Sequence, residues 1–278
     1  MANAGARAKA RKASLIDATR MRQLLQQGTD SIGASIGDFG YRSEMDVYST
    51  RMGGSDAIEA ALSHNLDNDL DSVLDFCQGN LKGLVAIYVE RYHYDKAKTV
   101  LRAVHKGASD ELIADQILPE ENPKNSLWLQ IVRTTETVQE AADAMAGSPW
   151  GRCLAKLEGE PSLQEMEDAL DRQYYANSLV AVRGKDANPQ MLRYMRTEID
   201  HRNIINQFRA LRQNLSVETR VNLNIPGGRI GDAVLRAATQ ADSEEALLDA
   251  LRRANAFNDS GFEEALLESN ESRSLDPV

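Results

Sequence analysis

The stretch SDELIADQILPE, residues 109–120, decides how the rest of the chain is interpreted, because it recurs as SVETRVNLNIPGG at residues 216–228. An offset of 107 residues places Ser109 on Ser216 and Pro119 on Pro226. A period of this length indicates that one folding unit is used more than once. The repeat is therefore the first guide to the architecture.

Signals for helices dominate the chain. Capping boxes occur at Thr137–Glu140 and Ser162–Glu165, where hydroxyl and carboxylate groups satisfy the free N–H groups of a first helical turn. Asn188 before Pro189 is typical of an N-cap followed by the first helical position. No alternating β pattern is present. The sequence predicts an all-α protein, with main helices at roughly 2–27 (bent near Asp17), 56–77, 80–106, 163–183 and 189–213.

Each of the two long helices that precede the repeated stretch has an apolar stripe at i, i+4 and i+7. Such a stripe predicts the face that is buried. Its members are Ala97, Leu101 and Val104 in the first copy and Ile204, Phe208 and Leu211 in the second. Arg102 and Arg209 lie on another side of these helices.

The repeat predicts three helical units, at residues 1–120, 121–226 and 227–278. A complete unit has a short-helix half and a long-helix half. The short half occurs three times and the long half twice, so the third unit is expected to be truncated. Judged from the first two units, roughly 65 or more residues would follow SLDPV at 274–278.

Composition excludes several classes of protein. A formal net charge of −10 and a pI near 5.0 argue against broad nucleic-acid binding. Cys77 and Cys153 match no metal or redox spacing and are expected to be buried thiols in a reducing compartment. The longest apolar run, GLVAIYV at 83–89, is far shorter than the ~20 residues that span a bilayer, so no transmembrane segment is predicted.

Four segments, in this order, carry a resemblance to a known family: ARAKARKASLIDATRMRQLLQQG (6–28), GGSDAIEAALSHNL (53–66), RYHYDKAKTVLRAVHKGAS (91–109) and TEIDHRNIINQFRALR (197–212). They resemble the C subunit of archaeal and bacterial A/V-type ATP synthases, the relative of the d subunit of eukaryotic V-ATPases. NIPGGRI and MEDALDRQYY extend the match to essentially the whole chain. His93 and Lys96 depart from it, because the family usually has Asp and Asn at these positions of the first copy.

The resemblance implies a non-catalytic, all-helical coupling protein without a cofactor or bound metal. Its three similar units would surround a pseudo-threefold axis and form a funnel. It would sit on the proteolipid ring at the cytoplasmic face of the cell membrane, as a peripheral protein, and accept the central shaft made of D/F-type subunits. This role belongs to rotary ATP synthesis and to proton or other ion transport.

Two other functions are open from the residues themselves. The first is a helical-repeat adaptor that binds a protein or peptide in a concave groove. The second is an enzyme that uses the neighbourhood of His93, Asp95 and His105. PGGRIG at 226–231 lacks the Walker lysine and a preceding strand, so a helix–helix turn is favoured over a phosphate loop.

Six cationic residues are the candidates for partner contacts. Arg102 and Arg209 occupy equivalent positions and either line the funnel or form internal ion pairs with acidic residues. Arg212 ends the second long helix. The N-terminal cluster either meets ring loops or an anionic lipid surface, or is a solvated terminus. This cluster consists of Arg7, Lys9 and Arg11, with Lys12 beside them.

Overall fold

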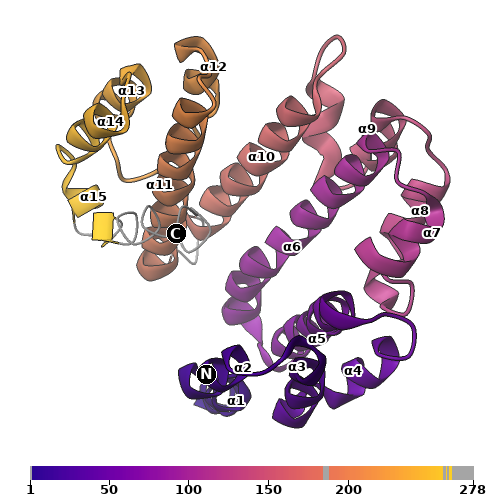
Figure 1. The fold of residues 1–278 in the computed structure, drawn as a ribbon. Helices are drawn as coiled ribbons and strands as arrows, with labels where there is room; N and C mark the ends of the chain where they lie inside the picture. The colour runs from indigo at the N-terminus through magenta and orange to yellow at the C-terminus, as the bar shows by residue number, and fades with distance from the viewer. Residues whose placement is uncertain (1, 184–187, 259–260, 262, 265–278) are drawn as a thin grey trace. The chain divides into compact units, whose positions relative to one another are not determined.

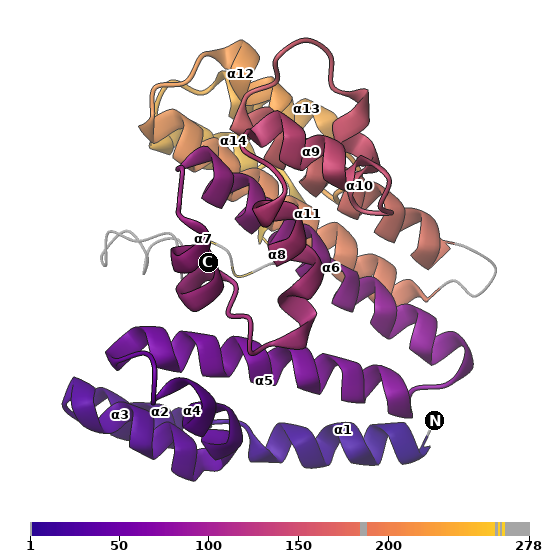
Figure 2. The same ribbon diagram turned by 90° about the vertical axis from the view of Figure 1, so that its right-hand side faces the viewer.

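The structure is a computed structural model that describes residues 2–183, 188–258, 261, 263 and 264. Within these residues every regular element is helical, so the predicted all-α class is confirmed (Figures 1 and 2). The chain forms two compact units, residues 1–166 and 167–278, which are described separately below. The SLDPV segment, on which the predicted truncation rests, lies outside the described residues.

Nine α-helices precede the end of the first unit: α1 (Ala2–Ser14), α2 (Ala18–Leu25), α3 (Thr29–Ile36), α4 (Arg42–Tyr48), α5 (Gly54–Phe76), α6 (Gly79–His105), α7 (Asp110–Leu112), α8 (Ser126–Arg133) and α9 (Val138–Ala146). Helix α10 (Leu163–Arg183) crosses the boundary between the units. The described part of the second unit continues with α11 (Pro189–Arg212), α12 (Val217–Asn222), α13 (Asp232–Gln240), α14 (Glu244–Leu251) and α15 (Asn255–Asn258).

The predicted starts of these helices have the expected caps. The Thr137 hydroxyl and the Glu140 carboxylate form a complete capping box at the start of α9. The Asn188 side chain accepts a hydrogen bond from the N–H of Met191 at the start of α11. The predicted bend near Asp17 is a complete break, because its carboxylate caps a new helix, α2. The first predicted helix is therefore two helices.

The predicted stripe is buried in both long helices. In α6, Ala97 and Leu101 are fully buried and Val104 is half-buried. In α11, Ile204 and Phe208 are buried in the core of the second unit. This core also contains Leu235, Leu247, Leu251 and Phe257 from α13, α14 and α15.

The first unit has a separate apolar cluster around α2, α3, α4 and α5. Leu24, Met45 and Tyr48 pack there against Ala57 and Ala61 of α5. Small alanine side chains let the neighbouring helices approach closely, and the Tyr48 hydroxyl lies 3.0 Å from His64 Nδ1. The N-terminal helices are thus fixed to α5 by packing.

Both long helices end in the same kind of turn. Gly107 follows α6 with φ 62°, and Asn214, at the 107-residue offset, follows α11 with φ 55°. The N–H of Ala108 donates to the Ala103 carbonyl at 3.1 Å, and the N–H of Leu215 donates to the Ala210 carbonyl at 3.0 Å. A left-handed residue that closes a helix in this way favours glycine or asparagine.

The next helices start alike as well. The Ser109 hydroxyl accepts the N–H of Leu112 at 3.2 Å, and the Ser216 hydroxyl accepts the N–H of Thr219 at 3.1 Å. The equivalent segments GASDEL (107–112) and NLSVET (214–219) therefore encode the same local structure: a left-handed residue followed two positions later by a serine N-cap.

The turn after α6 makes a prediction about stability. Gly107→Ala adds a methyl group that meets no atom within 4 Å, so its cost is conformational only. We expect it to lower the free energy of unfolding by about 1 kcal/mol, because a side chain disfavours positive φ. Urea denaturation measures the change.

Gly147→Ala is the matched control. Gly147 follows α9 with φ −75° and also has open space around it. This substitution should leave stability unchanged or raise it by about 0.4–1 kcal/mol. Equal effects of the two substitutions would contradict the assigned turn.

Candidate interaction sites

The N-terminal basic cluster is divided between two environments. The Arg7 guanidinium lies 4.9 Å from the centre of the Phe76 ring, and Arg11 forms an ion pair with Asp69. Both contacts fix α1 alongside α5 (Figure 2). Lys9 on the same helix is exposed, as is Lys12. Two of the four residues of the predicted cluster, Arg7 and Arg11, therefore contact the protein's own side chains.

The arginines near the ends of the long helices, Arg102, Arg209 and Arg212, are all exposed. Arg212 forms a two-point ion pair with Glu244, with Nε–Oε1 at 2.7 Å and Nη2–Oε2 at 3.3 Å. These hydrogen bonds raise the pKa of Arg212 above its usual value. Arg212 thereby ties the end of α11 to the start of α14.

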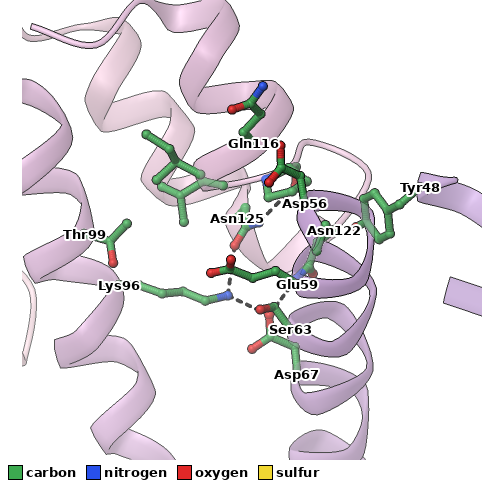
Figure 3. Close-up of a pocket in the computed structure, with 14 residues that line it drawn as sticks. Tyr48, Asp56, Glu59, Ser63, Asp67, Lys96, Thr99, Gln116, Asn122 and Asn125 are labelled. Atoms are coloured by element: carbon green, nitrogen blue, oxygen red, sulfur yellow. Dashed lines mark hydrogen bonds and ion pairs between the residues drawn. The ribbon is translucent and has the colours of Figure 1, made fainter. Parts of the chain in front are cut away.

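A polar cavity of about 430 Å³ lies between α5, α6 and residues 116–125 (Figure 3). Lys96 reaches across from α6, with its Nζ 2.7 Å from Asp67 Oδ2 and 2.9 Å from Asn125 Oδ1. Asn122 donates to the same Asp67 oxygen at 2.6 Å. The unusual lysine at position 96 thus belongs to a complete hydrogen-bonded network that fixes the loop before α8.

The equivalent positions of α11 hold their loop by a different chemistry. Asn203, at the offset from Lys96, accepts the N–H of Ile225 at 2.7 Å and donates to its carbonyl at 2.8 Å. Asp200, at the offset from His93, accepts the N–H groups of Arg229 and Ile230 at 2.9 and 3.1 Å. Burial raises the pKa of Asp200, while these N–H donors oppose the shift.

This geometry explains the glycines of PGGRIG. A Cβ atom at Gly228 would lie 2.1 Å from Asp200 Oδ1, so only glycine lets the loop approach α11 this closely. The N–H groups that a phosphate would need are occupied by the protein's own carboxylate. The segment is a helix–helix turn, as predicted, and not a phosphate loop.

The residues of the predicted enzyme alternative do not converge. His93 stacks on Trp150 at 5.0 Å between ring centres, while Asp95 pairs with Lys98 at 3.0 Å. His105 is twelve residues beyond His93 on the same helix, a rise of about 18 Å along the helix axis. The enzyme hypothesis based on these three residues is therefore wrong.

Both cysteines have the expected environment. Cys77 and Cys153 are buried free thiols, and burial raises the pKa of Cys153 to about 11. A thiol with a raised pKa is a poor nucleophile. Among the residues that the structure describes, no helix combines the length and apolar character that crossing a membrane requires.

The Lys96–Asp67 pair should contribute measurably to stability, because its side chains are only 18% and 12% exposed. In a double-mutant cycle of Lys96→Met and Asp67→Asn, we expect a coupling energy of roughly 1–3 kcal/mol. Each single substitution leaves a buried group without its partner, whereas the double substitution removes both charges. Urea denaturation of the four proteins measures the coupling.

The exposed pair between Arg133 and Glu120 is the matched control. Its side chains are 48% and 51% exposed, and Arg133 Nη2 lies 3.1 Å from Glu120 Oε2. Water screens such a pair, so the cycle of Arg133→Met and Glu120→Gln should give less than about 1 kcal/mol. A coupling at Lys96–Asp67 no larger than this would show that the network is not stabilising.

The described residues form an all-helical protein whose loops are held by side chains of the long helices. Comparison with known proteins specifies its kind. A profile of the ATP synthase (C/AC39) subunit family matches residues 4–276. The chain therefore belongs to this family, a non-catalytic structural subunit of the rotary ATP synthases, as its sequence resemblance predicted.

Individual relatives agree with this assignment. The chain is 28% identical over 260 residues to the C subunit of the A-type ATP synthase of Haloquadratum walsbyi, covering 91% of this chain and 74% of that protein. It is 30% identical over 237 residues to the protein of the same name from Halobacterium salinarum, covering 82% of this chain and 66% of the relative. It is 28% identical over 228 residues to the protein of the same name from Halorubrum lacusprofundi, covering 81% of this chain and 65% of the relative. The chain thus spans about two thirds to three quarters of the length of these relatives.

Proposed function

We propose that the chain is a central-stalk subunit that couples the shaft of the soluble catalytic head to the proteolipid ring of an A/V-type ATP synthase. It would act at the cytoplasmic face of the membrane as a peripheral protein. The observation that carries this proposal is the family match over residues 4–276. The related proteins are named as parts of A-type ATP synthases.

The helical packing suits a part that transmits torque. Helices α6 and α11 have 27 and 24 residues, and each buries one apolar stripe along its C-terminal half. Closely packed helices deform little under load. Lys96 of α6 holds the loop before α8, and Asp200 and Asn203 of α11 hold the loop between α12 and α13. Each unit should therefore respond to force as a stiff body.

The two equivalent turns support the proposed duplication of units. They match in backbone conformation, hydrogen bonding and serine caps at the 107-residue offset. Three similar units around a pseudo-threefold axis would form the funnel that receives the shaft. We propose that Arg102 and Arg209, both exposed at equivalent positions, contact the shaft, while Arg212 supports α11 through Glu244.

Co-purification tests the coupling role. A tagged chain, co-expressed with D- and F-type shaft subunits and separately with the proteolipid ring, should elute with each of them in size-exclusion chromatography. Binding to neither component would remove the proposed function. Elution with unrelated peptides, but not with these components, would favour the adaptor alternative.

Charge reversal tests the proposed contact with the shaft. We expect Arg102→Glu with Arg209→Glu to weaken shaft binding by roughly tenfold, and more at low salt, since interface charges act mainly through long-range attraction. The dissociation constant is measured with a biosensor on which the shaft subunits are immobilised. Arg152→Glu with Arg253→Glu alters the net charge equally at other exposed positions and should change binding less than about twofold. Equal losses would assign the effect to net charge alone.

A further inference from the structure

The N-terminal segment has a charge opposite to that of the rest of the chain. Residues 2–25 contain six cationic side chains and one carboxylate, in a protein with a formal net charge of −10. The cations are Arg7, Lys9, Arg11, Lys12, Arg20 and Arg22. The carboxylate, Asp17, accepts the N–H groups of Thr19 and Arg20 at 2.9 and 2.8 Å, and these hydrogen bonds lower its pKa. Asp17 therefore caps the start of α2 and cancels only one of the six positive charges.

Helix α1 has one face on the protein and one face in solvent. Arg7 and Arg11 are one turn apart and both contact α5, through Phe76 and Asp69. Measured from Arg7, Lys12 lies roughly 140° and Lys9 roughly 200° around the helix. Both are exposed, and neither forms an ion pair with any described carboxylate. Their ammonium groups are therefore directed away from the protein.

Helix α2, the next helix in the sequence, exposes apolar side chains. Leu24 is buried in the core, whereas Met21 and Leu25, one turn apart, are 49% and 78% exposed. Arg22 lies between them in the sequence and is also exposed, and Leu15 in the preceding connection is 50% exposed. Single exposed apolar residues are ordinary. Several of them within a short, basic, helical segment are typical of binding at a membrane interface.

We infer that residues 2–25 bind the surface of an anionic lipid bilayer directly, with Lys9, Lys12 and Arg22 near the headgroups and Met21 and Leu25 in the interface. The outer face of α1 favours lipid over a protein partner. It carries lysines among alanine and glycine, and such a surface offers no large side chain to anchor in a protein pocket. Attraction to anionic lipid needs only accessible cations and increases with their number.

Vesicle co-sedimentation of the full chain tests the inference. Protein-free vesicles of phosphatidylcholine are compared with vesicles that also contain phosphatidylglycerol. We expect the chain to bind the anionic vesicles preferentially, and less at high salt. Lys9→Gln with Lys12→Gln should weaken binding about 25-fold, at roughly fivefold for each cation lost. Leu25→Ser should weaken it about fivefold.

Matched variants separate this segment from the rest of the surface. Lys82→Gln with Lys156→Gln removes the same charge from exposed positions elsewhere, and Leu127→Ser removes a leucine that is 48% exposed on α8. Each should change vesicle binding less than about twofold. All substituted side chains are exposed, and circular dichroism checks that the fold is kept.

Two results would overturn the inference. One is a lack of preference for anionic vesicles. Equal binding to both kinds of vesicle would show that the cations do not contribute, and binding to neither would leave the segment to a protein partner. The other is an equal loss in the control variants. The vesicles contain no ring and no shaft, so the result is independent of the proposed coupling role.

Discussion

The burial of one apolar stripe on α6 and another on α11 is the constraint on which the described structure depends. Leu101 and Phe208 occupy equivalent positions and are both fully buried. Once these faces are buried, the C-terminal end of each helix is fixed in place. The left-handed residues Gly107 and Asn214 then turn the chain back at the same point. Short helices can pack beside the long ones because this turn is tight.

Polar side chains from the long helices complete this arrangement. Lys96 and Asn203 are equivalent in sequence, and each fixes a loop: Lys96 the one before α8, and Asn203 the one between α12 and α13. Lys96 uses a largely buried ion pair with Asp67, whereas the Asn203 side-chain amide accepts one hydrogen bond from the backbone and donates another to it. The same geometric requirement is met by different chemistry. Lys96 therefore holds its loop through side-chain partners, whereas Asn203 holds its loop through backbone groups.

These features bear on the proposed coupling role. Ion pairs between helices, such as Arg212–Glu244, add restraints to the packed core. The N-terminal segment is different, because α1 uses alternate faces for two purposes. Arg7 and Arg11 secure it to α5, and this fixed position presents Lys9 and Lys12 to the surroundings. Within the first unit, the proposed contact with anionic lipid therefore depends on the same packing that fixes α1 on α5.

The sequence by itself determined the helical class, the positions of the caps, the buried stripe and the family. These properties depend on neighbours within about four residues, as at Thr137 with Glu140, or on the spacing of apolar side chains along one helix. Only the tertiary structure decided which cations remain available. Arg11 pairs with Asp69 and Lys96 with Asp67 because packing brings α1 and α6 beside α5, across 58 and 29 residues of sequence. Arg7, Lys9, Arg11 and Lys12 look alike in a sequence, but the packing of α1 on α5 brings Arg7 and Arg11 into contact with Phe76 and Asp69 and leaves Lys9 and Lys12 exposed.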